Sequence, residues 1–390
     1  MKRKFSYLAC ALLYGIVVAL TACGSGSGTS SSTPPTTDAA DVVVLSNQLI
    51  RNGHQWIPHG FYQIAFEVPP AELPNQQKFW TTAQQNYTPA EYTQMKQFGA
   101  DSVRIQVAQT GMDFGNATFY SSAFHEEVIG AIKAARAAGL TVIVSVQDEP
   151  QTGDPAQDTA LPSDATQRVW QTLAPVFATD RGVLFELFNE PHIGKQATVP
   201  FPPADWPTWA AAMDRTIQTI RSTGAQNVVI ADGLQFAQEL SGAPVLNDPL
   251  HQVAYAVHPY SLVSGDQAST VWDEKFGAFA ATQPVIVSEW GIGYYCDPNT
   301  PQATVDFLAY LQAHSIGMEA GAWDWASTGF GSAIYGFPVV PAKISSFLTP
   351  SGTTSACRVN PTDKGYISGF GFGKLIQTWY QSGTPASRVQ

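Results

Sequence analysis

The 390-residue sequence predicts a (β/α)₈ barrel that occupies residues 41–390 as one domain. Apolar runs with the length of buried strands alternate with longer segments of helical periodicity, and eight such strands can be counted. This regular alternation is typical of a parallel sheet whose strands are joined by helices. The length agrees with one domain, because α/β barrels routinely fill about 250 residues or more.

The domain is predicted to open with a hairpin. Val42 to Arg51 forms its first strand, and Gln55 to Tyr62 leads into the first strand of the barrel. The Asn52-Gly53 pair between them favours the tight turn that a hairpin needs. The segment Thr88-Pro89-Ala90-Glu91 then has the pattern of a capping box with proline at the first helical position, which predicts a helix ending near Phe98.

The other elements follow from the same periodicities. The predicted strands are Ser102–Val107, Thr141–Val146, the run from Leu184 that ends in Asn189-Glu190-Pro191, Asn227–Ala231, Val253–Val257, Pro284–Glu289 and Met318–Trp323. The predicted helices are Phe124–Ala138, Asp164–Phe177, Asp205–Thr223, Leu234–Leu240, Thr270–Ala280, Thr300–His314 and Lys374–Tyr380.

Residues 1–23 have the features of an export signal. A basic start is followed by the apolar run Leu8–Leu20, which is too short for a comfortable membrane span. Its end, Leu20-Thr21-Ala22-Cys23, resembles the lipobox of bacterial lipoproteins, which implies that Cys23 becomes the lipidated N-terminus. The alternative is an ordinary signal with an incidental cysteine.

A flexible linker is predicted at residues 24–40. Gly, Ser, Thr and Pro dominate this stretch, and such a composition cannot bury enough apolar surface to order itself. The sequence therefore predicts an exported protein, lipid-anchored at the bacterial cell envelope or secreted, whose only membrane contact is the N-terminal lipid.

Two of the four cysteines, Cys296 and Cys357, belong to the predicted domain. Outside the cytoplasm a remaining pair of cysteines favours a disulfide, and two free thiols are the alternative. The spacing of neither cysteine is that of a metal ligand. No metal site or cofactor is predicted, because the motifs that hold metals, phosphates or nucleotides are missing from the sequence.

The composition also narrows the class of ligand. The net charge of −11, with only 20 Lys and Arg residues, argues against nucleic acid, whose phosphates require a basic surface. Ten tryptophans and 14 tyrosines supply many flat rings of the kind on which sugars stack. A monomer acting on a carbohydrate is expected.

Two glutamates end apolar strands in similar surroundings. Glu190 stands in Leu187-Phe188-Asn189-Glu190-Pro191, and Glu289 stands in Val287-Ser288-Glu289-Trp290-Gly291. On the strand count they end strands four and seven, so a barrel brings both to its C-terminal mouth. A pair of carboxyl groups is what cleavage of a glycosidic bond requires. Each glutamate alone would be read as a solvated charge at a strand end.

These two motifs resemble the acid/base and nucleophile strands of glycoside hydrolase family 5, the cellulase family, and the resemblance covers roughly residues 45–380. It implies a retaining mechanism in which Glu190 is the acid and later the base, while Glu289 is the nucleophile. Asn189 would then bind the sugar hydroxyl beside the anomeric carbon. Its alternative role is that of a turn-forming asparagine.

The resemblance extends to three other strand ends. Arg104, inside an apolar strand, would lie beside Glu289 and keep it ionised, with a structural ion pair to another acid as the alternative. His258-Pro259-Tyr260 matches the His-x-Tyr motif of the family, so that His258 would bond the sugar or the acid/base and Tyr260 would donate to the nucleophile. Trp323 matches the sugar-stacking platform, with a core tryptophan as the alternative.

The sequence departs from the family at Gln147, where a histidine usually ends the third strand. Glutamine can bond a sugar hydroxyl but cannot titrate. The predicted function is a retaining hydrolase of a β-linked polysaccharide, most specifically an endo-β-1,4-glucanase. The alternatives are a β-mannanase or other β-glycanase of the family and, from another class, an inactive glycan-binding lipoprotein.

Overall fold

The computed structural model describes residues 41–75, 78–148, 160–193, 203–262, 269–291, 300–324 and 372–385. The predicted signal, linker, lipidated Cys23 and the cysteines Cys296 and Cys357 lie outside the described residues. Among the described residues, no helix is both long and apolar enough to cross a membrane.

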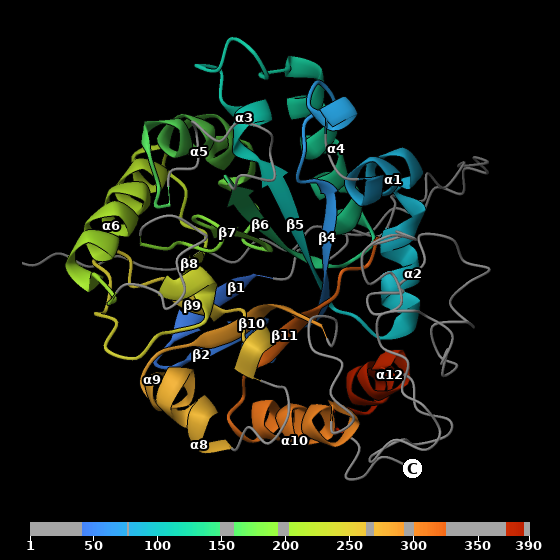
Figure 1. Ribbon diagram of the computed structural model, residues 1–390, viewed down its shortest axis with the longest axis vertical. Helices are drawn as coiled ribbons and strands as arrows, with labels where there is room; N and C mark the ends of the chain where they lie inside the picture. Colours follow the sequence, from blue (N-terminus) through green and yellow to red (C-terminus); the bar gives the residue numbers. More distant parts are fainter. Residues whose placement is uncertain are drawn as a thin grey trace, which may run out of the picture. The chain divides into compact units, whose positions relative to one another are not determined.

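Eight parallel strands close into a barrel, which confirms the predicted fold class (Figure 1). The order around the barrel is β4-β5-β6-β7-β8-β9-β10-β11, so each strand pairs with its neighbour in sequence and β11 closes onto β4. The strands are β4 (His59–Phe66), β5 (Ser102–Ala108), β6 (Thr141–Gln147), β7 (Val183–Glu186), β8 (Val229–Asp232), β9 (Val253–Val257), β10 (Val285–Trp290) and β11 (Gly317–Ala320).

The N-terminal hairpin differs from the prediction. The single strand predicted at 42–51 is wrong, because a turn at Ser46, whose φ is 58°, divides it into β1 (Val42–Leu45) and β2 (Gln48–Arg51). The Asn52-Gly53 turn does connect β2 to the next strand, β3 (His54–Gln55). Pro58, which has no N–H to give to a sheet, separates β3 from the first barrel strand, so the two are not continuous.

This small antiparallel sheet closes the N-terminal end of the barrel. The backbone N–H of Val42 donates to the carbonyl of Arg181, two residues before β7, and that of Val44 donates to the side chain of Gln252, directly before β9. Its apolar side chains pack against those that fill the barrel, in a cluster of Val42, Leu49, Trp56, Ile143, Leu184, Val228, Ile230, Ala254, Ala256 and Ile286. Among the described residues, this packing leaves the C-terminal end of the barrel for polar chemistry.

Helices surround the barrel, and some of them are capped by short polar side chains (Figure 1). Ser163 forms a capping box with Thr166, and Ser121 accepts the backbone N–H of Phe124. The helices are α1 (Lys78–Asn86), α2 (Ala90–Phe98), α3 (Gln109–Met112), α4 (Ser122–Ala137), α5 (Asp164–Phe177), α6 (Trp206–Ser222), α7 (Leu234–Ala237), α8 (Ser269–Trp272), α9 (Ala278–Ala280), α10 (Thr300–Ala313) and α12 (Phe372–Ser382).

Several features of these helices differ from the predictions. The helix predicted at 234–240 is only the short α7, in which Gln235 and Phe236 have positive φ. Helices α1 and α3 were not predicted, and the helix predicted at 270–280 is interrupted by a π-helical turn over Asp273–Gly277, between α8 and α9. Of the capping box predicted before α2, the bond from the Thr88 N–H to Glu91 Oε1 is present at 3.2 Å, while Pro89 rather than Thr88 occupies the N-cap.

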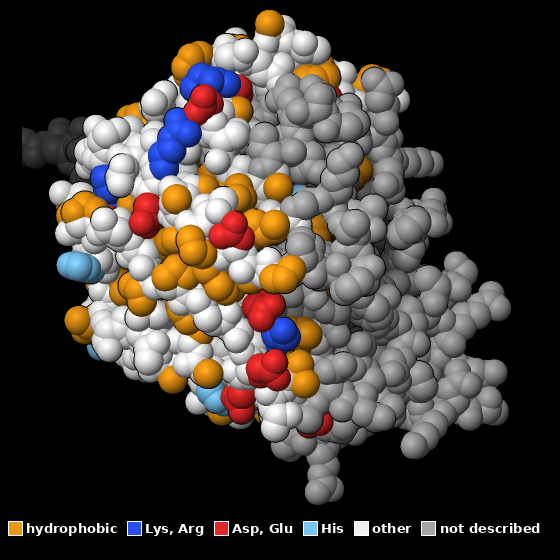
Figure 2. Space-filling view, turned by 60° about the vertical axis from the view of Figure 1, so that its left-hand side comes forward, with side chains coloured by type: hydrophobic (Ala, Val, Ile, Leu, Met, Phe, Trp, Pro, Cys, Tyr) orange, Lys and Arg blue, Asp and Glu red, His pale blue; other side chains and the backbone are white. Residues whose placement is uncertain are grey.

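The face shown in Figure 2 mixes charged, apolar and uncharged side chains. Several Lys and Arg side chains lie in a short row, another lies apart from them lower on the face, and acidic side chains lie beside both. This face is therefore not a basic surface. That the protein binds no nucleic acid stays a prediction.

Glu91 on α2 is buried and belongs to a polar cluster behind β4. Gln63 donates to Glu91 Oε2 at 3.0 Å, and Tyr92 donates to Gln63 at 3.0 Å. Burial, followed by the negative charge of Asp324, raises the pKa of Glu91 to about 9. The carboxyl is therefore protonated in the folded protein at neutral pH.

Replacing Glu91 with Gln is expected to stabilise the protein increasingly as the pH rises. Between pH 4.5 and 9 the folded protein holds a proton on Glu91 that the unfolded chain releases, so the free energy of unfolding falls by roughly 1.4 kcal/mol per pH unit. Glutamine removes this dependence, and the amide of Gln63 can rotate to present its oxygen to the new N–H groups. The melting temperature of Glu91→Gln minus that of the wild type should grow by roughly 2 °C per pH unit from pH 5 to 9. A difference that is constant over this range would contradict the assignment.

Candidate active site

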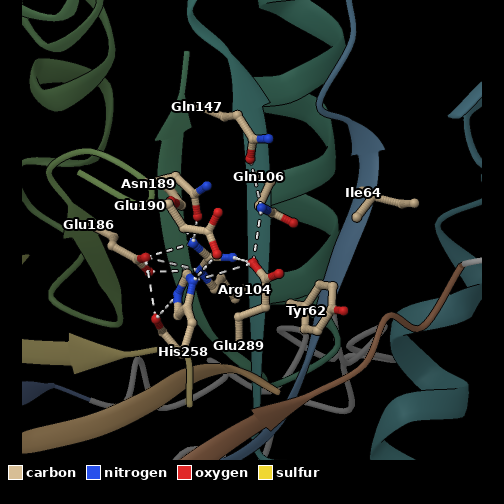
Figure 3. A network of polar contacts seen from close by, with 12 residues as sticks. Tyr62, Ile64, Arg104, Gln106, Gln147, Glu186, Asn189, Glu190, His258 and Glu289 are labelled. Atoms are coloured by element: carbon tan, nitrogen blue, oxygen red, sulfur yellow. Dashed lines mark hydrogen bonds and ion pairs between the residues drawn. The ribbon is translucent and has the colours of Figure 1, made fainter. Parts of the chain in front are cut away.

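The candidate site lies at the C-terminal end of the barrel, where side chains from different strands meet. Figure 3 shows Arg104 from β5 in the centre, with Glu186 from β7 on one side and Glu289 from β10 on the other. Glu190 lies four residues after the end of β7, His258 comes directly after β9, and both point to the same centre. The fold thus brings together residues that are far apart in the sequence.

The backbone holds Glu190 in an unusual conformation. Its φ is 49°, in the left-handed region that residues other than glycine seldom adopt. The N–H of Glu190 donates to Asp232 Oδ2 at 3.0 Å, and Pro191 follows directly. A carboxyl group at the end of β8 therefore fixes the turn that presents the Glu190 side chain.

Arg104 is completely buried and binds two acids. Its Nε donates to both carboxylate oxygens of Glu186, at 2.8 and 3.1 Å, and its Nη2 lies 2.6 Å from Oε1 of the same residue. Its Nη1 donates to Glu289 Oε2 at 2.9 Å. The two roles considered for Arg104, the neighbour of Glu289 and the partner in a structural ion pair, are therefore both present.

Glu289 accepts three hydrogen bonds. Oε2 accepts from Arg104 and from Gln106 Nε2, the latter at 3.2 Å, while Oε1 accepts from the Tyr260 hydroxyl at 2.8 Å. The Tyr260 hydroxyl also bonds that of Tyr62 at 2.8 Å. Burial raises the pKa of Glu289, and the charge of Arg104 and the bond from Tyr260 oppose that rise. The donors thus favour the ionised carboxylate in a place where burial alone would neutralise it.

His258 links Glu190 to the barrel interior. Its Nδ1 lies 3.0 Å from Glu190 Oε1, and its Nε2 lies 2.8 Å from Ser288 Oγ. Burial and the positive charge of Arg104 lower the pKa of His258 well below its ordinary value, so the ring is neutral. A neutral imidazole has one donor and one acceptor nitrogen. It can therefore accept a hydrogen bond from protonated Glu190 or donate one to ionised Glu190.

Beneath these residues lies a fully buried carboxyl, that of Asp232. Besides accepting the Glu190 N–H, its Oδ2 lies 3.6 Å from His258 Nε2. Burial, followed by the negative charge of Glu186, raises the pKa of Asp232 well above its ordinary value.

Two groups of side chains have the spacing of metal ligands. They are Glu190, His258 and Glu289, and Glu186, Asp232 and His258, with one possible ligand atom from each residue lying within 4.8 Å of the others in its group. The guanidinium of Arg104 already binds Glu186 and Glu289, and its charge repels a cation. A cation at either group would have to compete with Arg104 for these carboxylates.

The spacing of Glu190 and Glu289 is suited to direct attack on a bound sugar. One oxygen of each carboxyl lies within 4.8 Å of the other. Retaining glycosidases have their two carboxyl groups about 5–5.5 Å apart, whereas inverting enzymes need roughly 6.5–9.5 Å to admit a water. Both side chains are partly accessible, with exposed fractions of 18% for Glu190 and 13% for Glu289.

Most of the other predicted site residues join this cluster. The Asn189 carbonyl accepts from Arg104 Nη2 at 2.5 Å, which orients its amide. Gln147, 1% exposed at the end of β6, accepts a bond from Gln106 at 2.7 Å and donates to Glu67.

Trp323 does not lie as predicted. Its side chain is 2% exposed and packs against Phe61, with ring centroids 4.9 Å apart, and against Phe98 of α2. A sugar-stacking platform needs an open ring face. The structure thus gives Trp323 the alternative role, that of a core residue between the barrel and its helices.

Several residues that contact the predicted site were missed in the sequence, and four of them illustrate why. Glu186, Asp232, Ser288 and Gln106 all contact the predicted residues directly. A signal existed for Glu186, because an acid in the apolar run Val183–Leu187 and a base in the apolar strand Val103–Ile105 each need a buried partner. For the other three, only the strand register discloses the contact.

Comparisons with known proteins agree with this geometry. A protein-family model described as cellulase (glycosyl hydrolase family 5) matches residues 65–329. A beta-glucanase from Saccharophagus degradans, solved in complex with cellotetraose, has a TM-score of 0.57 and 19% identity and covers 75% of this chain and 87% of its own. A beta-mannanase from Thermomonospora fusca has a TM-score of 0.52 and 19% identity and covers 77% of this chain and 88% of its own.

An endo-beta-1,4-glucanase from Xanthomonas axonopodis pv. citri has a TM-score of 0.53 and 20% identity and covers 71% of this chain and 92% of its own. At such identities the three solved structures show the shared fold alone. The family model, in contrast, matches more than half of the chain. The protein therefore belongs to glycosyl hydrolase family 5, the cellulase family, and is a retaining glycosyl hydrolase of the β-glycanase type.

Proposed function

We propose that the protein is an endo-β-1,4-glucanase in which Glu190 is the acid/base and Glu289 the nucleophile. The observation that carries these roles is the placement of two partly exposed carboxyls within 4.8 Å, with three hydrogen-bond donors on Glu289 and a neutral histidine on Glu190. A binding protein would need no such difference between two acids, and this argues against the inactive, glycan-binding alternative.

In the first step a Glu289 oxygen bonds to the anomeric carbon as the glycosidic bond breaks, and the proton of Glu190 passes to the leaving oxygen. In the second step Glu190 takes a proton from water, whose oxygen bonds to the anomeric carbon and releases Glu289. His258 Nδ1, 3.0 Å from Glu190, can accept a bond from protonated Glu190 in the tautomer that carries its proton on Nε2. The released sugar keeps the β configuration.

The neighbouring polar residues have supporting roles in this proposal. Arg104 and Tyr260 hold Glu289 ionised through bonds of 2.9 and 2.8 Å. Asn189, oriented by Arg104, would bond the hydroxyl next to the anomeric carbon through its N–H groups. Gln147 would support the site from the end of β6 in place of the histidine that is usual in the family.

The preferred sugar is the finer part of the proposal. The structural relatives include both glucanases and a mannanase at 19–20% identity, so a β-mannanase is the second candidate. The test is the release of reducing sugar from carboxymethyl cellulose, mixed-linkage glucan, mannan and xylan in parallel. Release from the cellulose derivative with a rapid fall in viscosity supports the proposal. Release from mannan alone would favour the second candidate, and silence of folded protein on all four would favour the binding-only alternative.

We also propose that the protein is exported and anchored through a lipid on Cys23, with a disulfide between Cys296 and Cys357 and a monomeric catalytic domain. The support for the lipid anchor is the sequence alone: the lipobox-like Leu20-Thr21-Ala22-Cys23 and the Gly/Ser/Thr/Pro-rich segment that follows it. Loss of membrane association in Cys23→Ala, measured by fractionation of the producing cells, tests the anchor.

A further inference from the structure

A row of uncharged amides leads from the nucleophile to a second buried acid. Gln106 Nε2 donates to Glu289 Oε2 at 3.2 Å and to Gln147 Oε1 at 2.7 Å, and Gln147 Nε2 donates to Glu67 Oε1. All three side chains are buried, with exposed fractions of 2% for Gln106, 1% for Gln147 and 6% for Glu67. Figure 3 shows Gln106 between Gln147 and Glu289.

Strand register explains why this row exists. Arg104 and Gln106 are two residues apart on β5 and therefore point to the same face, as do Ser145 and Gln147 on β6. Arg104 bonds Ser145 Oγ at 2.9 Å in a lower layer, and Gln106 bonds Gln147 in the layer above it. Glu289 Oε2 spans the two layers, since it accepts from both Arg104 and Gln106.

The row has a direction, and Glu67 sets it. Gln147 presents its N–H to Glu67 and its carbonyl to Gln106, the orientation that an ionised carboxylate at the end of the row requires. Gln106 must then present its N–H groups to Gln147, and the same NH₂ group meets Glu289. If the amide of Gln106 were reversed, its carbonyl would face two acceptor oxygens.

We propose that Gln106 is a positioning residue for the nucleophile, and that Glu67 acts through Gln147 to fix the amide of Gln106 as a donor. This inference rests on the proposed role of Glu289. The Gln106 bond stabilises the carboxylate form of Glu289, on the oxygen that Arg104 also binds, and orients its Oε1 for attack. Gln147 cannot titrate, but it can hold the amide of Gln106 in the orientation in which that amide donates to Glu289.

The test measures the pKa of Glu289 directly, in protein labelled with ¹³C at the glutamate side-chain carboxyl, with the signal assigned by its loss in Glu289→Gln. Gln106→Leu should raise this pKa by about one unit or more, because a hydrogen bond to a charged group is lost. Glu67→Gln keeps the size of the side chain, but its new amide can also donate, so the amides of Gln147 and Gln106 are no longer fixed in one orientation. A smaller rise in the pKa of Glu289 is therefore expected.

The matched control is Gln63→Leu. Gln63 is a buried glutamine on the neighbouring strand β4 that also bonds a carboxyl, that of Glu91, but on the side away from the site. The variant Gln63→Leu should lower the melting temperature and leave the pKa of Glu289 unchanged. A Glu289 pKa in Gln106→Leu within about 0.2 units of wild type overturns the proposal. A shift in Gln106→Leu but none in Glu67→Gln overturns the part assigned to Glu67.

A second readout is the pH dependence of kcat/KM on the polysaccharide that the wild type degrades best. The acidic limb should move to higher pH in Gln106→Leu by the same amount as the pKa of Glu289, and it should not move in Gln63→Leu. A wild type that is inactive on every β-glycan would count against the proposed function. The carboxyl titration needs no substrate, so the pKa comparison would still test the role of Gln106 and Glu67.

Discussion

Replacing Glu289 with Gln is expected to reduce kcat by about 10⁴-fold or more while sugar binding remains nearly intact. An amide has no carboxylate oxygen with which to form the glycosyl-enzyme, yet it has the same size. Its carbonyl can still accept from Arg104 Nη1 and Gln106 Nε2, and its N–H can donate to the hydroxyl of Tyr260. The measurement is the rate of reducing-sugar release, together with the affinity for an oligosaccharide by calorimetry.

The barrel offers a matched control in Glu319→Gln. Glu319 is buried on β11, next to the strand of Glu289, and accepts from Ser102 Oγ at 2.5 Å. Burial raises its pKa well above the ordinary value, so it is already an uncharged acid and glutamine resembles it closely. Glu319→Gln should retain activity within a few-fold. Turnover by Glu289→Gln within tenfold of wild type would remove Glu289 from the nucleophile role.

The barrel could be predicted because its signals are local. Each barrel strand is an apolar run, and a segment of helical periodicity separates one run from the next. The hairpin was predicted less well, because a turn at Ser46 and Asn47 has a weaker signature than Asn52-Gly53, and the interruption at Pro58 was overlooked. The π-helical turn at Asp273–Gly277 leaves no mark in the spacing of apolar residues.

The candidate site could be predicted only in part. Glu190 and Glu289 were paired because both end strands, and the fold class alone brings strand ends together. Which residues meet in one layer depends on register, so Asp232 under Glu190 and Gln106 beside Glu289 could not be derived from spacing. Trp323 was predicted to bind sugar because it lies near a strand end, but a residue there can also face the helices instead of the barrel mouth, as Trp323 does.

Replacing Glu190 with Gln is expected to slow hydrolysis of a natural polysaccharide by about 10²–10⁴-fold, because the leaving sugar oxygen then departs without a proton. The size of the loss should depend on the leaving group. A dinitrophenyl β-glycoside, whose phenolate needs no proton, should form the glycosyl-enzyme at a rate within about tenfold of wild type. Hydrolysis of that intermediate should still be slow, since Glu190 is also the base that activates water. The expected trace is a burst of dinitrophenolate followed by slow turnover.

Two further measurements distinguish a lost acid/base from a damaged site. Azide attacks the glycosyl-enzyme without a base, so it should accelerate turnover of Glu190→Gln and yield the β-glycosyl azide, with no such effect on Glu289→Gln. The alkaline limb of the wild-type pH profile, which requires a proton on Glu190, should be missing in Glu190→Gln. His258 stays neutral across this range because burial and the charge of Arg104 lower its pKa, and so its titration cannot supply that limb. An alkaline limb that persists unchanged in Glu190→Gln would therefore assign the acid to another residue.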